Sequence, residues 1–463
     1  MFSDNSGAKR ALKQWKSIQV IIVWLFITGL LGNLTTVFAQ QANKIANTTS
    51  SFDKTSSLAI SANVTTLPRV SLTTLIEQTL ENNPEIKSLQ RNYDMMRARI
   101  PQAKAMPEPM LEVGYMGNII PLPPLDIQKG DPSSARMISF TQEIPFPGER
   151  SLRGKMALME ADSNWWLYEQ TRFNIIAELK QAYFEYWYLT KAIDTLAKNK
   201  ELLEKFAKIT ESSYSVGRGT QQDLLKAQVE ISRLIEQQAL LTQRQETIVA
   251  QINSLRYQEI NTLLGTPEEL RPFEFDHTLA GLNEIALSES PSLKLQRRRI
   301  DREQYAIQLA KKEFYPDMSF GFSYQNRPGM PEMYGITFGL KLPLYFWQKQ
   351  RPALTEAVAS ASMEKQRLDN TIAVLQYRIK DRYLALTTAQ QLINLYRSVI
   401  IPQATAALES AIVGYETGKV DFLTLLNNQL TLLNYQLSYY EQLSNAEKAV
   451  ASLEPLVGTT LRH

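Results

Sequence analysis

Residues 213–225 read SYSVGRGTQQDLL and residues 414–426 read GYETGKVDFLTLL, so a tyrosine, a glycine and a pair of leucines recur at the same spacing. Gly217 and Gly418, which are 201 positions apart, stand where the end of a helix needs a residue in the left-handed conformation. Both stretches lie within long sequence that has helical periodicity. We therefore predict that each is the turn of a helical hairpin, and that the whole hairpin is duplicated.

The end of each turn is a typical start of a new helix. Thr220 and Asp421 align with each other. Both are favourable N-cap residues, because their side-chain oxygens accept a hydrogen bond from the free N–H groups of the first helical turn. Asp223 follows Thr220 after three positions, which is the spacing of a capping box. We expect the two turns to occupy residues 216–220 and 417–421.

Long helices are predicted before both turns. No proline occurs between Pro147 and Pro267, and a continuous helix over residues 154–213 would be about 90 Å long at about 1.5 Å per residue. Such a rod is too long for a compact globular domain. Apolar residues recur at steps of three and four, which is coiled-coil spacing. In the two halves these positions are Ile176, Leu179, Tyr183, Tyr186, Thr190, Ile193 and Ala197, and Ile372, Leu375, Ile379, Tyr383, Leu386, Gln390 and Ile393.

Alternation of apolar and polar residues predicts four strands, near residues 110–117, 135–146, 318–325 and 334–344. Each is about long enough to cross a membrane at a tilt. The alternative is a half-buried sheet in a soluble domain, because alternation is a weak signal in any one segment. The loops that join each pair of strands are rich in proline and glycine, as is typical of exposed turns.

The same order of elements occurs in both halves of the chain: short helices, two strands, a long helix, a turn and a return helix. Pro84 aligns with Pro291 at the break within the short helices, at an offset of 207. We therefore assign a first repeat to residues 71–270 and a second repeat to residues 271–463.

The N-terminus has the composition of an export signal. Basic residues precede an apolar run at residues 18–31, and VFA at residues 37–39 offers small residues for cleavage before Gln40. We assign residues 1–39 as a signal peptide; an uncleaved membrane anchor is the alternative, although the run is shorter than the roughly 20 residues of a spanning helix. Residues 40–70 are predicted to be a flexible lead-in, because much of the segment is rich in Ser, Thr and Asn.

Composition excludes several functional classes. Lys and Arg number 50 against 47 Asp and Glu, so no basic nucleic-acid-binding surface is indicated. There is no cysteine and there are two histidines, which excludes disulfides, thiolate sites and histidine-rich metal sites. No sequence signature of nucleotide-binding, zinc-protease or serine-hydrolase catalysis occurs. We expect no enzymatic activity, no cofactor, no bound metal and no nucleic-acid partner.

Taken together, the repeat order and the turn motif resemble the TolC-like outer-membrane efflux protein family. The resemblance covers roughly residues 70–460 and is carried by the paired strands, the two turn stretches, and the NNPEI and ESPSL breaks. The stretch EIPFPGER, at residues 143–150, is similar to the heavy-metal efflux branch of that family.

The resemblance implies a mainly α fold with membrane β structure. It implies a homotrimer, in which four strands from each chain close a twelve-stranded β-barrel in the lipid of the bacterial outer membrane. Long coiled-coil helices would form a hollow α-barrel cylinder that extends into the periplasm. In each half the short helices would stack end to end on a return helix.

The function that the resemblance implies is that of a passive exit duct from the periplasm to the exterior. The duct would belong to a tripartite efflux or type I secretion system, with a periplasmic adaptor (membrane fusion) protein and an inner-membrane pump of the RND or ABC type. The alternative is a secreted or periplasmic coiled-coil scaffold without channel activity. The exported substrate is not indicated by the sequence. The implied adaptor-docking turns consist of Val216, Gly217, Arg218, Gly219 and Thr220, and of Thr417, Gly418, Lys419, Val420 and Asp421.

An acidic constriction is expected close to these turns. Asp223, Glu416 and Asp421 are the candidate gate residues, and the alternative is that Asp223 and Asp421 only cap helices. A second expected surface is an aromatic belt at the membrane interface, made of Tyr345, Phe346 and Trp347, which follow the last strand. Ordinary packing of these three rings is the alternative.

Overall fold

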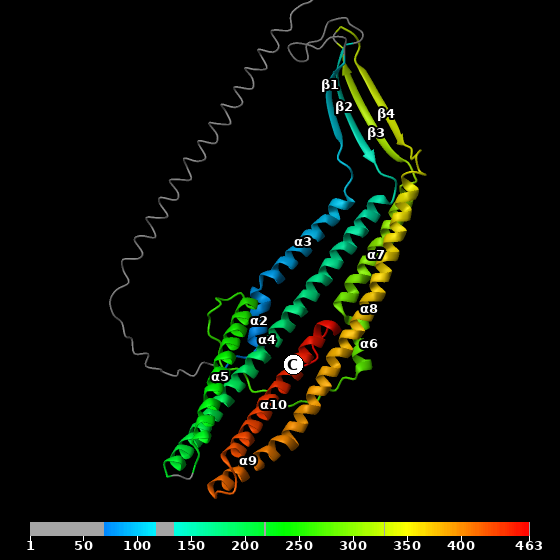
Figure 1. Ribbon diagram of the computed structural model, residues 1–463. Coiled ribbons are helices and arrows are strands. Elements are labelled where there is room, and N and C mark those ends of the chain that lie inside the picture. Colours follow the sequence, from blue (N-terminus) through cyan, green and yellow to red (C-terminus); the bar gives the residue numbers. More distant parts are fainter. Residues whose placement is uncertain (1–68, 117–133, 217–218, 328, 463) are drawn as a thin grey trace, which may run out of the picture. The chain divides into compact units, whose positions relative to one another are not determined.

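The computed structural model describes residues 69–116, 134–216, 219–327 and 329–462, and the fold is mainly helical with four strands (Figure 1). The predicted signal peptide and most of the predicted lead-in lie outside these residues. The elements of the first half are α2 (Leu72–Asn82), α3 (Pro84–Lys104), β1 (Met110–Met116), β2 (Ala135–Ile144), α4 (Glu149–Ser215) and α5 (Gln221–Leu255). Those of the second half are α6 (Leu279–Glu289), α7 (Pro291–Lys312), β3 (Asp317–Asn326), β4 (Met333–Lys341), α8 (Gln350–Leu395), the π-helix η1 (Tyr396–Ile400), α9 (Ile401–Glu416) and α10 (Phe422–Val457). The predicted duplication of a helix–strand–helix plan is confirmed.

The longest element is α4, whose 67 residues form the predicted uninterrupted helix. It packs against α3, α5, α7 and α10, so its middle part is enclosed by neighbours. Leu179, Trp187 and Leu189 are fully buried there. No helix in the described ranges combines the length and the apolar character needed to span a membrane.

The predicted apolar stripe of α4 is buried at first and then drifts. Leu179, Tyr183 and Tyr186 are buried, but Ala197 is exposed, and Leu196 occupies the core instead. The prediction was wrong at Ala197 because a helix with 3.6 residues per turn rotates slowly relative to a strict seven-residue repeat.

The short helices break at Asn83 and Ser290, each of which caps a helix that opens with proline. The Asn83 side chain accepts hydrogen bonds from the N–H groups of Glu85 and Ile86 at 2.9 and 3.2 Å, and its Nδ2 donates to the carbonyl of Leu255, the last residue of α5, at 2.9 Å. The start of α3 therefore meets the end of α5.

The same joint occurs in the second half. Gly458 lies directly after α10 and close to Glu289. A Cβ atom added at Gly458 would lie 2.6 Å from the carbonyl oxygen of Glu289. The start of α7 thus meets the end of α10, and the predicted end-to-end stacking is confirmed in both halves.

The four strands form one antiparallel sheet in the order β1-β2-β3-β4. Strand β2 ends at Ile144, two residues before the predicted end, and β4 ends at Lys341, three residues before it. Pro145 and Pro343 explain both differences, because proline has no N–H group to donate to a neighbouring strand. Residue 117, the predicted end of the first strand, lies outside the described residues.

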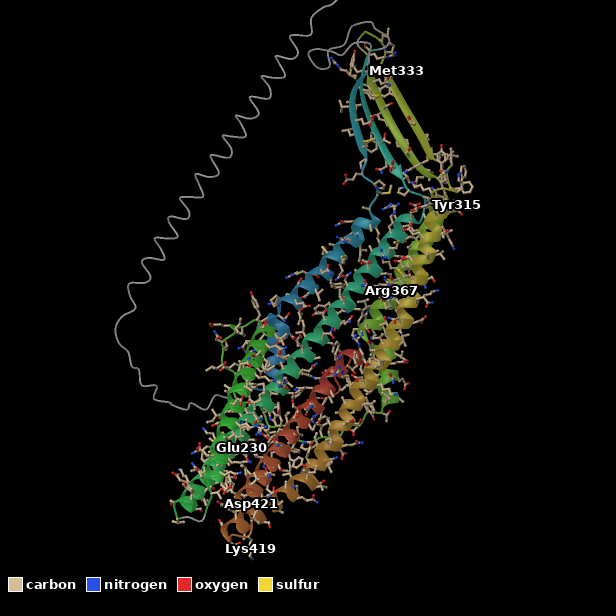
Figure 2. The ribbon with its side chains drawn as sticks, viewed as in Figure 1. Glu230, Tyr315, Met333, Arg367, Lys419 and Asp421 are labelled. Atoms are coloured by element: carbon tan, nitrogen blue, oxygen red, sulfur yellow. The ribbon has the colours of Figure 1, made fainter. Side chains whose placement is uncertain are left out.

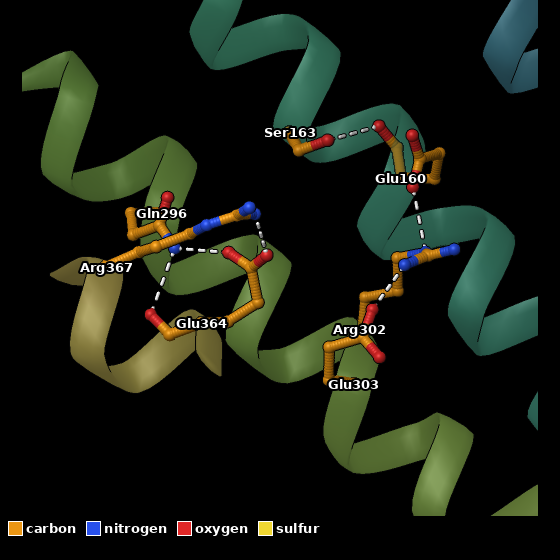
Figure 3. Close-up of polar contacts among 7 residues, drawn as sticks. All are labelled: Glu160, Ser163, Gln296, Arg302, Glu303, Glu364 and Arg367. Carbon is orange, nitrogen blue, oxygen red and sulfur yellow. Dashed lines mark hydrogen bonds and ion pairs between the residues drawn. The ribbon is translucent and has the colours of Figure 1, made fainter. Parts of the chain in front are cut away.

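Polar contacts join α7 to the long helices on both of its sides (Figure 3). Toward α4, Arg302 of α7 forms an ion pair with Glu160 at 2.9 Å. Toward α8, Gln296 donates to the backbone carbonyl of Glu364 at 3.1 Å, while Arg367 pairs with the carboxylate of the same residue. These contacts fix α7 between α4 and α8.

A buried ion pair joins the two halves of the chain. The Nζ atom of Lys180, on α4, lies 2.6 and 2.8 Å from the carboxylate oxygens of Glu454, on α10. Glu454 is 2% exposed. Because an isolated buried charge is costly, each partner depends on the other.

Candidate functional site

One face of the sheet is apolar and exposed along its whole length. The register places Phe140 opposite Phe322, and Phe320 opposite Phe338, so these side chains share a face. Phe338 is 80% exposed. Further exposed apolar residues on this face are Leu111, Val113, Ile138, Met318, Tyr334, Ile336 and Leu340.

The opposite face carries small and polar residues. Directly opposed pairs there include Thr141 with Gly321, and Ser319 with Gly339. A sheet with an exposed apolar face needs another apolar environment to cover it, either a partner or a membrane. The polarity of the two faces is that of strands with lipid on one side and a polar interior on the other.

Both edges of the sheet are available for pairing. In the described parts of the chain, β1 and β4 each pair with a single strand, β2 and β3 respectively. Each therefore presents a row of unpaired backbone N–H and C=O groups along its outer side. Such edges are templates for another strand and are normally covered or paired in a native protein.

The three predicted belt aromatics lie in the turn that follows β4. Tyr345, Phe346 and Trp347 are 69%, 39% and 52% exposed. The rings of Phe346 and Trp347 are 5.2 Å apart, and Arg351 lies over Phe346 at 5.6 Å from the ring centre. The three residues thus gather at one end of the apolar face, and their role at a membrane interface stays a prediction.

The second predicted turn has the hydrogen bonds of a Schellman motif. Gly418 has φ +72°, and the N–H of Lys419 donates to the carbonyl of Gly414 at 2.8 Å. Lys419 and Asp421 are labelled at this end of the helices in Figure 2. Asp421 then caps α10, because its Oδ1 accepts from the N–H of Thr424 at 3.0 Å. The predicted left-handed glycine and N-cap are both confirmed.

The first predicted turn is described only in part. Gly217 and Arg218 lie outside the described residues, and Val216 is exposed. Thr220 caps α5 in the predicted capping box: its Oγ1 accepts from the N–H of Asp223 at 3.2 Å, while the Asp223 carboxylate accepts from the N–H of Thr220 at 3.4 Å. The two halves therefore start their return helices with different caps at the same aligned position.

A close approach inside each turn favours glycine at one of two aligned positions. In the second turn a Cβ at Gly414 would lie 2.5 Å from the Cγ2 atom of Val420. In the first turn glycine occupies the other position: a Cβ at Gly219 would lie 3.1 Å from the backbone nitrogen of Tyr214 and 3.3 Å from the Cβ of Ser213. Ser213 aligns with Gly414 and Gly219 with Val420, so the small residue has changed sides.

The three candidate gate residues lie in different local settings. Asp223 and Asp421 both cap helices, as the alternative interpretation expected, whereas Glu416 is the exposed last residue of α9. Hydrogen bonds from Thr424 lower the pKa of Asp421. No hydrogen bond or ion pair links these three carboxylates within the described residues, and a role in a constriction stays a prediction.

The two turns are joined by contacts that the sequence did not reveal. The hydroxyl groups of Thr210, on α4, and Tyr415, on α9, are 3.3 Å apart, and Thr210 is fully buried. Around them, apolar residues from α4, α5, α9 and α10 share one core, which includes Phe206, Leu408 and Phe422. The only signal in the sequence was the recurrence of tyrosine one residue away from the small residue of each turn.

Known proteins provide an independent comparison. A family model described as "Outer membrane efflux protein" matches residues 75–255 and 282–459, well over half of the chain. The cobalt-zinc-cadmium resistance protein CzcC of Cupriavidus metallidurans is 19% identical over 386 residues, which cover 81% of this chain and 87% of that protein.

Two solved structures have a similar fold. The outer membrane protein VceC of Vibrio cholerae superposes with a TM-score of 0.71 at 18% identity, over 84% of this chain and 97% of that one. The open state of the MtrE outer membrane channel of Neisseria gonorrhoeae gives a TM-score of 0.63 at 15% identity, over 86% and 95%. Because the sequence identities are low, the similarity to these two structures establishes the fold alone.

Proposed function

The chain belongs to the outer membrane efflux protein family, and from this premise we propose that it is the outer-membrane exit channel of a tripartite efflux system. It conducts substrates passively from the periplasm to the exterior and catalyses no reaction. The observation that carries the proposal is the four-stranded sheet with one exposed apolar face and two unpaired edges. A second candidate, the scaffold without channel activity, would leave that apolar face uncovered.

The sheet is completed by further copies of the chain. Strand β4 of one copy pairs with β1 of the next, and because these strands differ, the contact is head-to-tail and closes as a ring. Three copies give a closed barrel of twelve strands with no remaining edges, whose apolar residues face lipid and whose Thr, Ser and Gly residues face the lumen. The chain is thus a homotrimer.

The helices continue the duct on the periplasmic side. A helix of 67 residues is about 100 Å long at about 1.5 Å per residue. The ends of α4 at Ser215 and of α9 at Glu416 therefore lie far from the sheet, where a periplasmic adaptor can reach them. The adaptor connects the duct to an inner-membrane pump of the RND or ABC type.

Divalent metal cations are the proposed cargo. Two observations favour them: the similarity of residues 143–150 to the heavy-metal branch, and the relative named for resistance to cobalt, zinc and cadmium. In this arrangement the pump selects the ion and the duct conducts it. Asp223, Glu416 and Asp421, present three times in a trimer, supply carboxylates close to the periplasmic entrance.

Engineered cysteines test the ring directly, since the chain has none of its own. Val113→Cys on β1 combined with Ile336→Cys or Phe338→Cys on β4 is expected to give a disulfide-linked ladder up to three chains on a non-reducing gel. The single variants are expected to give none. Ile138→Cys with Tyr324→Cys, directly opposed on β2 and β3, is the matched control and crosslinks only within one chain.

Channel activity is tested by single-channel conductance of the purified protein in a planar bilayer. Stable openings are expected for the wild type. If the carboxylate of Asp223 faces the constriction, Asp223→Asn reduces the preference for cations. If the Asp223→Asn variant conducts with unchanged ion selectivity, Asp223 acts only as a helix-capping residue. A folded protein that neither crosslinks between chains nor inserts would overturn the proposal and favour the scaffold.

A further inference from the structure

A cavity of about 410 Å³ lies where the sheet meets the helices. Its walls come from the first residues of α4 and α8, the end of α7, the first residue of β3, and the end of β4 with the turn that follows. Tyr315, labelled in Figure 2, is one of its lining residues. Of the residues given a predicted functional role above, Tyr345 alone lines this cavity.

One part of the cavity wall is acidic: Glu149 is buried, Asp317 is half-buried and Glu313 is exposed. Glu149, the first residue of α4, is 3% exposed, and Asp317 and Glu313 also line the space. Burial, and then the nearby charges of Asp317 and Glu313, raise the pKa of Glu149, although Arg153 offsets part of this through an ion pair at 3.2 Å. A positively charged group entering the cavity would relieve the repulsion among the three carboxylates.

Next to this acidic wall is an acceptor without a donor. Gln350, the first residue of α8, is 8% exposed, and its Oε1 atom has no hydrogen-bond partner among the described residues. A buried carbonyl oxygen without a partner costs about 1–3 kcal/mol. A ligand that carries N–H groups can satisfy it after a small rotation of the side chain.

The remaining polar wall is basic and leads to an apolar rim. Lys341 and Lys349 are exposed and form no ion pair with another described residue. Leu342, Leu344 and Tyr345 lie between them along the chain and are mostly solvent-exposed. The cavity thus offers an anion site, a cation site and an apolar exit side by side.

This combination excludes simpler ligands. A lone anion would meet the three carboxylates, and a lone cation would meet Arg153, Lys341 and Lys349. Among the described residues no group of three or more His, Cys, Asp or Glu is arranged to hold a metal ion. The lining fits a zwitterion whose cationic end donates hydrogen bonds.

We propose that the cavity binds the phosphoethanolamine headgroup of a membrane phospholipid. The primary ammonium lies between Glu149 and the Oε1 atom of Gln350, the phosphate contacts Lys349, and the acyl chains leave past Leu342 and Leu344. The inference rests on the proposed function, which brings the junction of sheet and helices to the membrane surface.

The headgroup chemistry provides its own control. Phosphocholine has the same charges, but its quaternary ammonium has no N–H group to donate to Gln350. Binding of short-chain phosphatidylethanolamine and phosphatidylcholine to the detergent-purified full chain is measured by native mass spectrometry. About tenfold tighter binding of the ethanolamine lipid is expected, since one hydrogen bond to a charged group contributes about that much.

Two variants localise the site. Gln350→Met, of similar volume, is expected to abolish the preference, so that the ethanolamine and choline lipids bind with about equal affinity. The affinity for the choline lipid should not change. Lys349→Gln, at an exposed position, is expected to weaken both lipids severalfold. Lys380→Gln, an exposed lysine on α8 outside the cavity, is the control and changes neither. Equal binding of the two lipids, or an unchanged preference in Gln350→Met with native circular dichroism, overturns the proposal.

Two further outcomes separate the alternatives. Glycerophosphoethanolamine, which has no acyl chains, is expected to compete only at concentrations at least 100 times higher; equal potency overturns the assignment to a lipid. If a neighbouring copy of the chain fills the cavity, the assembled protein binds neither lipid with preference, which also overturns it. A protein that conducts but lacks the preference refutes only this site, whereas one that has the preference but does not conduct refutes the channel.

Discussion

The long helices of the two halves share one plan and differ in a single turn. In the first half α4 is uninterrupted for 67 residues, whereas in the second half α8, the π-helix η1 and α9 together cover residues 350–416. The π-helix ends at Ile400, two residues before Pro402. Since proline donates no hydrogen bond, a change of helix type is expected close to it.

The numbering of equivalent residues shows what this turn does. Several buried positions in the middle of the helices correspond at an offset of 200, as Leu179 does with Ile379, but the hairpin turns correspond at 201, as Tyr214 does with Tyr415. A π-helical turn holds one residue more than an α-helical turn between hydrogen-bonded partners. The π-helix therefore absorbs one additional residue and keeps the core and the turn in phase.

Deleting one residue from each helix should give the largest difference between the halves. Deletion of Lys198 from α4 rotates the helix beyond it by about 100°. This moves Leu203 and Phe206 out of the core, and each is worth about 1.5–3 kcal/mol. Deletion of Ser398 combined with Pro402→Ala should leave an ordinary α-helix, with stability within about 1 kcal/mol of that of Pro402→Ala alone.

The measurement is the midpoint of urea unfolding in detergent, with secondary structure checked by circular dichroism. Equal losses for the two deletions would show that the π-helix does not hold the additional residue.

The buried ion pair should produce the next largest difference. Lys180 and Lys380 occupy equivalent positions on α4 and α8, but Lys180 is 9% exposed and paired with Glu454, whereas Lys380 is exposed. Lys180→Met leaves Glu454 charged and buried, which should cost about 3–5 kcal/mol. Lys380→Met should change the free energy of unfolding by less than about 0.5 kcal/mol.

Chemical unfolding of both variants in the same detergent checks this prediction. Similar values for the two would mean that solvent reaches Glu454 in the assembled protein.

The two turns carry glycine at different aligned positions, so the arrangement of the first turn can be built into the second by mutation. Gly414→Ser introduces a Cβ against Val420 and should cost about 1–3 kcal/mol. Adding Val420→Gly recreates the arrangement of Ser213 and Gly219 in the first turn. Part of the loss should then be recovered, which gives a coupling energy of about 1 kcal/mol in a double-mutant cycle. Additive effects of the two changes would contradict a direct contact between the positions.

The smallest effect concerns the cap of the second turn. Hydrogen bonds from Thr424 lower the pKa of Asp421 in the folded state. The carboxylate therefore stabilises the fold above its unfolded pKa, and this contribution is lost as the pH falls through the lower folded value. Asparagine also caps helices but does not titrate in this range.

Unfolding midpoints of wild type and Asp421→Asn at pH 6 and pH 3 measure this contribution. The wild type should lose more stability than the variant on acidification. Equal losses of stability in the two proteins would show that Asp421 does not contribute to the destabilisation by acid.

Much of the fold could be predicted because its signals are local. The turn residues Gly418, Thr220 and Asp421 act on the backbone next to them, and proline marks the start of α3 and α7. Alternation indicated the strands, since one face of the sheet differs so strongly from the other. The wrong assignment of Ala197 came from extending a strict heptad over a helix that does not keep it.

The site was harder to predict because it depends on residues that are far apart in the sequence. No sequence pattern marks Lys180 as buried, because its burial depends on the packing of α10 against α4. The cavity at the junction takes Glu149, Asp317 and Gln350 from three different elements. Pro402 indicates a change in the helix close to it, but proline does not distinguish a π-helix from a kink.

The unpaired edges of β1 and β4 also have a kinetic consequence. If further copies complete the sheet, as proposed above, a chain presents both edges before it meets another copy, so correct closure competes with pairing to unrelated strands. Association becomes faster as the concentration of the chain rises, and a chain that is alone has nothing to complete its sheet. The time that each copy spends unassembled is thus set by its rate of synthesis, and holding factors that cover strand edges would matter most when expression is low.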